Sequence, residues 1–469
     1  MTKSQLNKQF GEECGIVGVY YPNGDVSRLA FYGIYALQHR GQESAGIASS
    51  DGHAIKLRTG MGLVTHVFKD EDLDYLTGNT AIGHTRYSTT GTSNIKNAQP
   101  IIVDGEGFKL GVAHNGNVVN SFELKQELEE LGQEFNTSSD SEVIAKIIAS
   151  APASTWEGRI AYLMRKVQGA YSLTLMTEKE LLAVRDPLGV RPLCFGSVNG
   201  GWVIASESCA LDNVGAKFVR QVKPGEAILF DATGFKSIYQ KDTGKCSFCV
   251  FEHIYFARPD SKIDGKLVYK SRLLMGKELA REHPVEADMV IGVPDSATAS
   301  AVGYSEESGI PFGEGFVKNR YVGRTFINPD QRMREVGVKV KLNPLKELIE
   351  GKRLVVVDDS IVRGTTSKPV VSLLRNAGAR EIHLRICAPP IKFPCHFGVD
   401  FPTRKELIAA NNSIEEIRDN IDADSLGYLS HSGLLKSVKE DSSAVCMGCF
   451  TGNHPIPVQL EMDKLSLEV

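Results

Sequence analysis

The chain lacks the features of membrane, secreted and nucleic-acid-binding proteins. No apolar run approaches the roughly 18 residues that a membrane-spanning helix needs, and residues 1–13 lack the apolar core of a signal peptide. The 53 basic and 57 acidic residues leave a net charge of -4, so no basic field favours nucleic acid. Nine cysteines, an odd number, argue against a secreted disulfide framework. We therefore expect a cytoplasmic protein whose thiols are free, catalytic or metal-bound.

The 469 residues, 42% of them hydrophobic and 23% charged, have the composition of an ordinary globular protein. At roughly 150 residues per domain, this length predicts two or three domains. Up to about residue 235, the sequence predicts short apolar strands separated by glycines. Two helices are expected among them, at 121–132 and 139–149. Runs of strands with separate helices are typical of a layered α+β domain. Beyond the polar segment 240–247, strands such as 311–316 alternate with helices, as in a parallel sheet.

The most specific motif is LVVVDDSIVRGTTS at 354–367. An apolar strand ends at Asp358 and Asp359, where ligands of open α/β sheets bind. A turn then opens a helix, whose first N–H groups can hold an anion. Carboxylates there suit ribose hydroxyls or Mg²⁺, and the complete motif disfavours the alternative that they only cap a helix. The turn residues expected to hold a phosphate are Arg363, Gly364, Thr365, Thr366 and Ser367. No G-x-x-x-x-G-K-[ST] occurs, so a P-loop nucleotidase is disfavoured.

This run resembles the ribose-phosphate motif of type I phosphoribosyltransferases. The resemblance implies that the turn binds the 5-phosphate of phosphoribosyl pyrophosphate (PRPP) and that the acids bind its ribose. Residues 292–296, GVPDS, are similar to the family's pyrophosphate loop, and Ser296 is implied to join Asp358 and Asp359 around Mg²⁺. Residues 318–326, KNRYVGRTF, resemble the family's flexible lid, which lies at the start of the longer segment 318–341. This segment has seven basic residues against two acidic ones, which would attract a polyanion.

Four polar segments in the first half accompany a cysteine at the start of an apolar strand. Taken alone, Cys14 in CGIVGV is more often a structural cysteine, and the serines at 138–142 are simple helix caps. The other segments are HRGQESAG at 39–46, HTRYST at 84–89, and HNGN at 114–117, which is expected to be a turn. Together they closely resemble class II glutamine amidotransferases, which use an N-terminal cysteine as nucleophile.

That resemblance gives each position a role. Cys14 attacks the side-chain amide of glutamine, while Asn115 and Gly116 form the oxyanion hole. Arg86 binds the substrate carboxylate and Asp140 its α-ammonium group. An arginine fork suits a carboxylate, and fixed amide donors suit an oxyanion. The α-amino group of an N-terminal cysteine, with a pKa near 7.7–8.0, can accept the thiol proton. The mechanism therefore requires that residues 1–13 be removed as a propeptide.

From Cys14 to about residue 452, the chain resembles the glutamine phosphoribosylpyrophosphate amidotransferases. The implied fold is an N-terminal nucleophile hydrolase-like α+β sandwich of two antiparallel sheets between helices, at 14–243. An α/β type I phosphoribosyltransferase domain with a mostly parallel sheet and a helical tail follows at 244–469. The implied reaction is glutamine + PRPP + water → 5-phosphoribosylamine + glutamate + pyrophosphate, the first committed step of purine synthesis. Feedback inhibition by AMP and GMP and a homotetramer are also implied.

Two other functions are open to such a chain. Another class II amidotransferase would share the first half, but it would not need the VVVDDSIVRGTTS run. A non-catalytic PRPP-sensing regulator would keep the second half, but it would not need the glutaminase residues, Cys14 and Arg86 among them. The assay that separates these possibilities is PRPP-dependent release of glutamate from glutamine.

Two C-x₂-C pairs, at 246–249 and 446–449, allow a Cys₄ zinc site. Some members of the resembled family instead carry a 4Fe-4S cluster. On that resemblance its ligands are Cys249, Cys395, Cys446 and Cys449, with Cys246 as a competitor of Cys249. The alternative is that these are buried thiols, as in cluster-free relatives. Three cysteines beside apolar runs are expected in the core: Cys194, Cys209 and Cys387.

Overall fold

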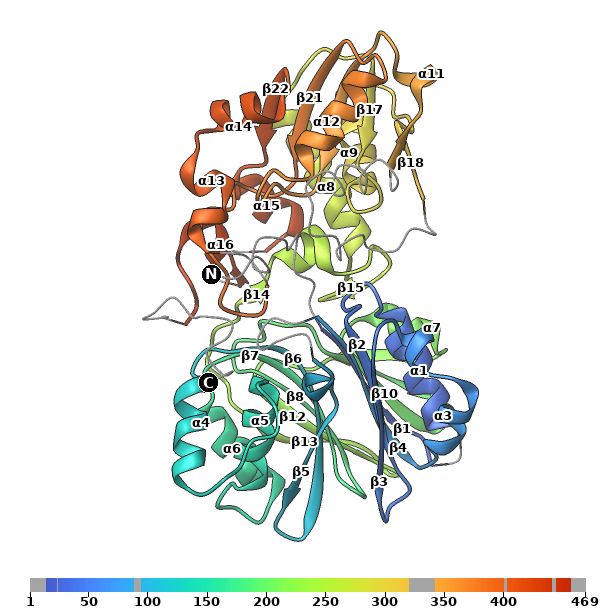
Figure 1. Ribbon diagram of the computed structural model, residues 1–469, viewed down its shortest axis with the longest axis vertical. Helices are drawn as coiled ribbons and strands as arrows, with labels where there is room; N and C mark the ends of the chain where they lie inside the picture. The colour runs from blue at the N-terminus through green and yellow to red at the C-terminus, as the bar shows by residue number, and fades with distance from the viewer. Residues whose placement is uncertain are drawn as a thin grey trace.

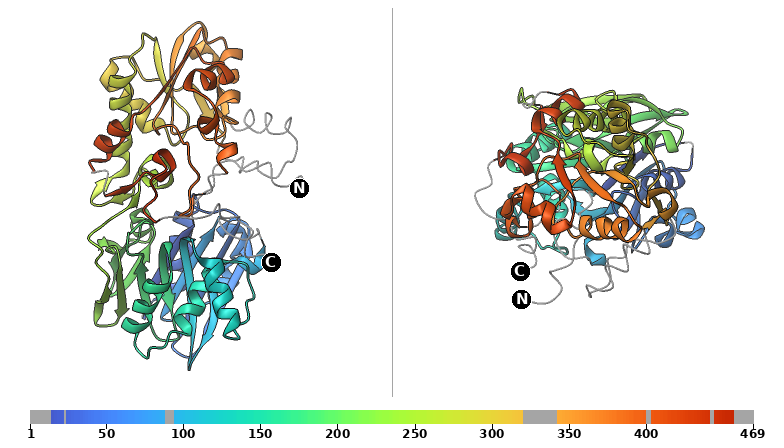
Figure 2. Two further views of the ribbon diagram at one scale, coloured as in Figure 1. Left: turned by 90° about the vertical axis from the view of Figure 1, so that its left-hand side faces the viewer. Right: turned by 90° about the horizontal axis from the view of Figure 1, so that it is seen from above.

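The computed structural model describes residues 14–22, 24–87, 94–319, 342–399, 403–440 and 444–456. It contains two bodies stacked end to end (Figures 1 and 2). The predicted boundary at 243/244 falls between the last strand of the first body, β13 (Gly234–Gln240), and β14 (Phe248–Cys249). No helix in these described segments is long and apolar enough to cross a membrane.

The first domain is a sandwich of two antiparallel sheets between two layers of helices, as predicted (Figure 1). The sheet orders are β11-β9-β10-β1-β4-β2-β3 and β13-β12-β8-β7-β6-β5. The first sheet comprises β1 (Gly15–Tyr20), β2 (Ser44–Ser50), β3 (Ile55–Met61), β4 (Thr80–Arg86), β9 (Cys194–Val198), β10 (Gly201–Ala205) and β11 (Lys217–Gln221). The second comprises β5 (Ile101–Gly105), β6 (Phe108–Val118), β7 (Gly169–Met176), β8 (Leu181–Arg185), β12 (Glu226–Asp231) and β13.

Apolar side chains fill all three spaces between these layers. Ile16, Ile82 and Phe195 are fully buried between the two sheets. The outer layers pack on the opposite faces, because each sheet must also cover its second apolar surface. Figure 1 shows α1 (Val26–Ala36), α3 (Asp70–Tyr75) and α7 (Ser208–Asn213) over the first sheet, and α4 (Ser121–Glu130), α5 (Asp140–Ala149) and α6 (Trp156–Lys166) over the second.

The second domain is built on a four-stranded parallel sheet of order β17-β20-β21-β22. Its strands are β17 (Met289–Gly292), β20 (Arg353–Asp358), β21 (Glu381–Ile386) and β22 (Ser425–Tyr428). The helices include α8 (Val268–Glu282), α9 (Thr298–Ser308), α12 (Ser367–Asn376), α14 (Ile414–Ile421) and α15 (His431–Val438). Buried strands with apolar side chains on both faces are what the β-α-β pattern predicted.

Two local predictions differ from the structure. In place of a strand over 311–316, Phe312 forms one bridge to Val290, and β18 (Phe316–Lys318) pairs instead with β19 (Leu342–Pro344). A proline and two glycines in that stretch weaken strand pairing. The turn expected at 114–117 is also wrong, because these residues continue β6 beside β7.

Candidate active sites

Four of the predicted glutaminase residues line one cavity in the first domain. Cys14, Arg86, Gly116 and Asp140 come from four separate segments and surround a space of ≈ 220 Å³. Cys14 immediately precedes β1, Arg86 ends β4, Gly116 lies in β6, and Asp140 begins α5. Because β1 and β4 are neighbours in one sheet and β6 belongs to the other, the cavity opens where the two sheets meet. The remaining lining residues are Tyr87, Gln99, His114, Ser139 and Ser141.

The Cys14 thiol is buried at this cavity. Its Sγ donates a hydrogen bond to the carbonyl oxygen of Tyr87 at 3.4 Å. Burial raises the pKa of the thiol to about 11, although the Tyr87 contact and the nearby Arg86 act in the opposite direction. At neutral pH the thiol therefore keeps its proton unless a base beside it removes that proton.

Asn115 and Gly116 lie within β6 rather than at a turn. Asn115 is 1% exposed, and its Nδ2 has no hydrogen-bond partner among the described residues. Gly116 has φ +151, and a Cβ at this position would lie 2.0 Å from the carbonyl oxygen of Ala170 in β7. Only glycine lets β6 and β7 approach this closely while the backbone bends toward the cavity. An unpartnered buried amide donor is a costly arrangement unless a ligand satisfies it.

Arg86 and Asp140 are held at the cavity by local contacts. Arg86 is 3% exposed, and Glu43 lies 3.8 Å from its guanidinium group. Asp140 Oδ2 accepts a hydrogen bond from the backbone N–H of Val118 at 3.0 Å. Ser139 is the N-cap of α5, so the expectation that the serines at 138–142 cap a helix is confirmed. The same segment places the Asp140 carboxylate at the cavity.

Sequence reasoning missed the polar residues beneath the cavity. His114 Nδ1 lies 3.0 Å from Ser141 Oγ, and its Nε2 lies 3.5 Å from the Ala170 carbonyl oxygen. Gln99 accepts from the His114 backbone N–H and donates to Ser141 Oγ. Burial lowers the pKa of His114, so its ring is neutral. His114 and Ser141 lie in the segments 114–117 and 138–142 that the sequence singled out, but the contacts between them involve two strands and a helix.

In the second domain, Asp358 and Asp359 lie at the carboxyl end of β20, as predicted. Ser296 Oγ donates to Asp359 Oδ2 at 2.5 Å, which joins the predicted pyrophosphate loop to the acidic pair. Both carboxylates are 7% exposed. Burial raises the pKa of both, and repulsion from Asp359 further raises that of Asp358. Two buried carboxylates beside a hydroxyl form a donor set that a divalent cation would neutralise.

The predicted phosphate turn opens α12. The side chain of its N-cap residue, Thr366, makes no capping hydrogen bond to the helix, whose N-terminus is a general site for anion binding. Gly364 has φ +75, a backbone conformation that glycine adopts without strain. The Arg363 side chain turns to an ion pair with Glu406 at 3.0 Å. Within the predicted lid, Lys318 forms an ion pair with Asp295, and residues 320–341 lie outside the described residues.

The four predicted cluster cysteines come together where the two ends of the second domain meet. Cys249 in β14 is the parallel register partner of Cys446 in β23 (Val445–Cys446). The carbonyl oxygen of Cys449 accepts from the backbone N–H groups of Lys392 and Phe393, just before Cys395. Burial raises the pKa of Cys449 well above its usual value, and Cys395, Cys249 and Cys446 add to the shift.

The other cysteines lie apart from this group. Cys246 has Arg185, Asp264 and Asp186 as its charged neighbours. Cys194, Cys209 and Cys387 are buried, as predicted, and all nine cysteines are free thiols. Among the described residues, no three His, Cys, Asp or Glu side chains are placed to hold one metal ion.

Comparisons with known proteins cover both domains. A glutamine amidotransferase domain model matches residues 84–213, and a phosphoribosyl transferase domain model matches residues 274–388. An amidophosphoribosyltransferase of Archaeoglobus fulgidus is 49% identical over 452 residues, covering 95% of this chain and 98% of that protein. The amidophosphoribosyltransferase of Synechococcus elongatus is 48% identical, covering 97% of this chain and 94% of its own length.

Solved structures show the same two-domain arrangement. Glutamine PRPP amidotransferase from B. subtilis, complexed with ADP and GMP, superposes with a TM-score of 0.90 at 45% identity, over 97% of this chain and all of that one. A structure described as the allosteric regulatory enzyme of purine biosynthesis gives 0.89 at 46% identity, over 95% and 97% of the two chains. With both domains matched in one continuous alignment, the chain belongs to the amidophosphoribosyltransferases, the glutamine-dependent transferases that aminate PRPP.

Proposed function

We propose that the cavity at Cys14 hydrolyses glutamine and that the site at Asp358 and Asp359 transfers the released ammonia to PRPP. The balanced reaction is glutamine + PRPP + water → 5-phosphoribosylamine + glutamate + pyrophosphate. The observation that carries this assignment is the single cavity that gathers Cys14, Arg86, Gly116 and Asp140. Neither another class II amidotransferase nor a PRPP-sensing regulator would require both of these sites.

In the first site, Cys14 Sγ attacks the side-chain amide carbon of glutamine. The Asn115 amide and the Gly116 N–H stabilise the oxyanion, which gives the buried Asn115 Nδ2 the partner it lacks. Arg86 pairs with the substrate carboxylate and Asp140 with its α-ammonium group. Collapse of the tetrahedral intermediate expels ammonia and leaves a thioester, and water then hydrolyses this to glutamate.

The base in this scheme is the α-amino group of Cys14 after removal of residues 1–13, which lie outside the described residues. His114, the imidazole among the described lining residues, has contacts at both ring nitrogens, so it is poorly placed to deprotonate the thiol. A free amine of pKa near 7.7–8.0 on the same residue can accept that proton. Intact-mass analysis should show active enzyme beginning at Cys14, and active enzyme that retains residues 1–13 would contradict the mechanism.

In the second site, we propose that α12 and its preceding turn bind the 5-phosphate of PRPP, with Thr365 and Ser367 as hydroxyl donors. Ser296, Asp358 and Asp359 would hold Mg²⁺, which when bound offsets the charge of the pyrophosphate leaving group. The support is the two buried carboxylates beside a hydroxyl and the position of the turn at the N-terminus of α12. Omission of Mg²⁺ should abolish PRPP-dependent synthesis.

The two-site scheme predicts separable activities. Cys14→Ala should abolish glutamine-dependent synthesis of phosphoribosylamine while retaining synthesis from added ammonia, because only the first site is damaged. Simultaneous measurement of glutamate and pyrophosphate release tests this directly. Loss of both activities, with the fold intact by thermal melting, would contradict independent sites.

We propose that Cys249, Cys395, Cys446 and Cys449 hold a 4Fe-4S cluster in a reducing cytoplasm. The support is that the four thiols are mutual electrostatic neighbours. The cluster would be structural, since the reaction transfers no electrons.

Iron content and visible absorbance after anaerobic purification test this assignment. Cys446→Ser should lose iron, whereas Cys246→Ser should keep about four irons per chain. A colourless, iron-free wild-type protein would refute the cluster.

We further propose that purine nucleotides such as AMP and GMP inhibit the enzyme and that it forms a homotetramer. The support is the B. subtilis relative, whose structure contains ADP and GMP. Inhibition curves at fixed PRPP test the first point. Light scattering coupled to size exclusion tests the second, and the mass of a single chain would contradict it.

A further inference from the structure

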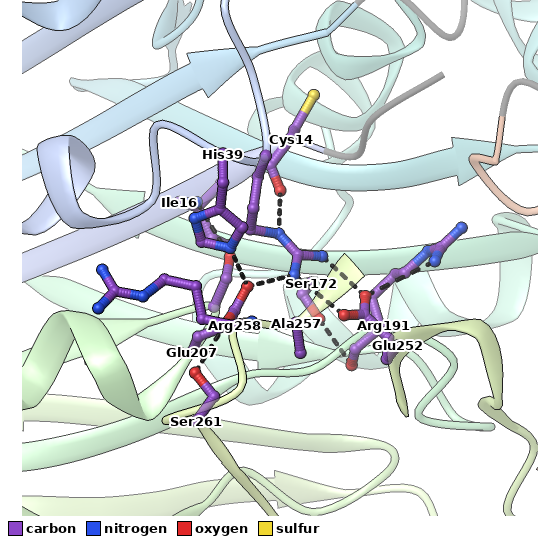
Figure 3. Close-up of polar contacts among 12 residues, drawn as sticks. Cys14, Ile16, His39, Ser172, Arg191, Glu207, Glu252, Ala257, Arg258 and Ser261 are labelled. Carbon is purple, nitrogen blue, oxygen red and sulfur yellow. Dashed lines mark hydrogen bonds and ion pairs between the residues drawn. The ribbon is translucent and has the colours of Figure 1, made fainter. Parts of the chain in front are cut away.

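Directly behind the nucleophile lies a buried cluster of charges that neither active site uses (Figure 3). Its centre is Arg40, between α1 and β2, with carboxylates from Glu207 and Glu252. Arg40 is 1% exposed, Glu207 3% and Glu252 0%. Arg40 and Glu207 belong to the first domain, whereas Glu252 follows β14 in the second. The cluster therefore lies at the interface of the two domains.

The guanidinium group of Arg40 uses its whole fork. Its Nε donates to the carbonyl oxygen of Cys14 at 3.1 Å. Nη1 donates to Glu207 Oε1 at 2.6 Å and to Glu252 Oε2 at 3.0 Å. Nη2 donates to Glu252 Oε1 at 2.7 Å. Because the fork is planar and rigid, the two carboxylates fix the direction of the Nε–H bond and hence the position of the Cys14 carbonyl.

Both carboxylates are anchored by further contacts across the interface. Glu207 Oε2 accepts from the Arg258 backbone N–H at 2.8 Å and from Ser261 Oγ at 2.7 Å, both in the second domain. His39 Nε2 lies 2.8 Å from Glu207 Oε1 on the side of the first domain. Burial alone would raise the pKa of Glu207, but His39 and Arg40 together hold it well below its usual value. Glu207 is therefore ionised in the folded enzyme.

A second arginine balances the charge of Glu252. Arg191 Nη1 lies 3.8 Å from Glu252 Oε1, and the same guanidinium donates through Nε and Nη2 to the carbonyl oxygen of Phe397. Two arginines thus face two glutamates where water is excluded. A buried ion that loses its partner is strongly destabilised, so Arg40 would reorient if Glu252 were neutralised or withdrawn.

We propose that Arg40 is a positioning residue for Cys14, and that Glu252 of the second domain completes the glutaminase centre by fixing Arg40. Docking of the second domain is then part of the assembly of the first active site. The inference rests on the proposed role of Cys14 as nucleophile. The segments HRG at 39–41 and FEH at 251–253 would then contribute to the reaction by positioning Cys14, without contacting the substrate.

The principal test is Glu252→Gln, which keeps the shape and removes the charge. The glutaminase kcat should fall at least tenfold, while the KM for glutamine stays within twofold because Arg86 and Asp140 still bind the substrate. Synthesis from PRPP and added ammonia should stay within twofold. Rates are referred to the fraction of chain whose mass begins at Cys14, so that incomplete processing does not imitate the effect.

Glu278→Gln is the matched control. Glu278 is also a buried, ion-paired carboxylate of the second domain, but its partners Arg281 and Lys436 belong to the same domain. This variant should leave the glutaminase kcat unchanged. A loss as large as that of Glu252→Gln would show a general effect of removing a buried charge and would overturn the proposal.

Arg40→Lys keeps the charge but cannot form the fork, and it should also lower kcat with little change in KM. Because both residues act through one contact chain, the double variant with Glu252→Gln should be no slower than the slower single variant. Losses that multiply, an unchanged kcat in Glu252→Gln, or an equal loss of ammonia-dependent synthesis would each overturn the proposal. Glutamate release that survives the single substitution Cys14→Ala would instead refute the proposed role of Cys14.

Discussion

Gly116→Ala should disable glutamine hydrolysis by separating two strands at the oxyanion hole. A Cβ at Gly116 would lie 2.0 Å from the carbonyl oxygen of Ala170 and 2.7 Å from its carbonyl carbon. A carbon and a carbonyl oxygen in contact keep about 3.3 Å between them. At this point β6 must therefore move away from β7 by about 1 Å, and the Gly116 N–H moves with it.

The expected loss is large because an oxyanion donor acts only at close range. A misplacement of about 1 Å can cost about 10²-fold in rate. Complete loss of one oxyanion donor costs roughly 10²–10³ in kcat, which is about 2.7–4 kcal/mol. We expect kcat for glutamate release to fall within this range. The KM for glutamine should change little if, as proposed, Arg86 and Asp140 hold the other end of the substrate.

Gly107→Ala is the matched control, since Gly107 has φ +80 but no atom within 4 Å of an added Cβ. It lies between β5 and β6, so alanine there imposes left-handed strain at the start of the same strand, β6, without a clash. Glutamate release should persist in this variant, and ammonia-dependent synthesis should persist in both. A Gly116→Ala enzyme whose kcat stays within threefold of wild type would refute the reasoning.

Three further predictions concern binding, stability and transfer. Arg86→Lys should raise the KM for glutamine about 10- to 100-fold, because a charged hydrogen-bonded pair contributes about 1.5–3 kcal/mol and lysine cannot form the two-pronged contact. Steady-state glutaminase kinetics measure this KM, and an unchanged value would contradict the proposed role of Arg86 in binding the substrate carboxylate. Burial lowers the pKa of His84 to about 3, so its ring is neutral in the folded protein. The folded state therefore loses stability as pH falls below 6.5, the ordinary pKa at which the ring is protonated in the unfolded chain. Between pH 7.5 and 5, urea unfolding should show wild type losing about 2 kcal/mol more than His84→Asn, and equal losses would contradict a buried neutral ring. Asp359→Asn should abolish synthesis from glutamine and from ammonia but leave PRPP-independent glutamate release, and surviving ammonia-dependent synthesis would exclude Asp359 from the transfer site.

The sequence predicted which residues gather at the two candidate sites because most of these residues lie in short segments of unusual composition. Asp358 and Asp359 follow an apolar strand directly, and the order strand, acids, turn and helix determines which edge of the sheet they occupy. Cys14, Arg86 and Asp140 each lie at an end of a strand or helix, where side chains reach a cavity. Position at the end of an element is a local property, so it can be inferred from the local sequence.

The remaining features depend on pairing between distant segments. HNGN has the composition of a turn, and only the neighbouring β7 keeps these residues in a strand, so local propensity failed there. Arg40 and Glu252 are 212 positions apart and meet only after both domains have folded. A charged residue beside a glycine ordinarily indicates a solvated loop, and nothing local to Arg40 distinguishes it from one.

The parallel pairing of β14 with β23 also constrains how the enzyme is made. β14 is the first strand of the second domain and β23 the last, so their contact closes a loop of roughly 200 residues. Such a closure is slow, because the entropy of bringing the ends together must be lost before any contact forms. A chain emerging from the ribosome cannot make this contact until Cys446 has been synthesised. Termination before β23 would leave the domain unclosed and its edges accessible to proteases.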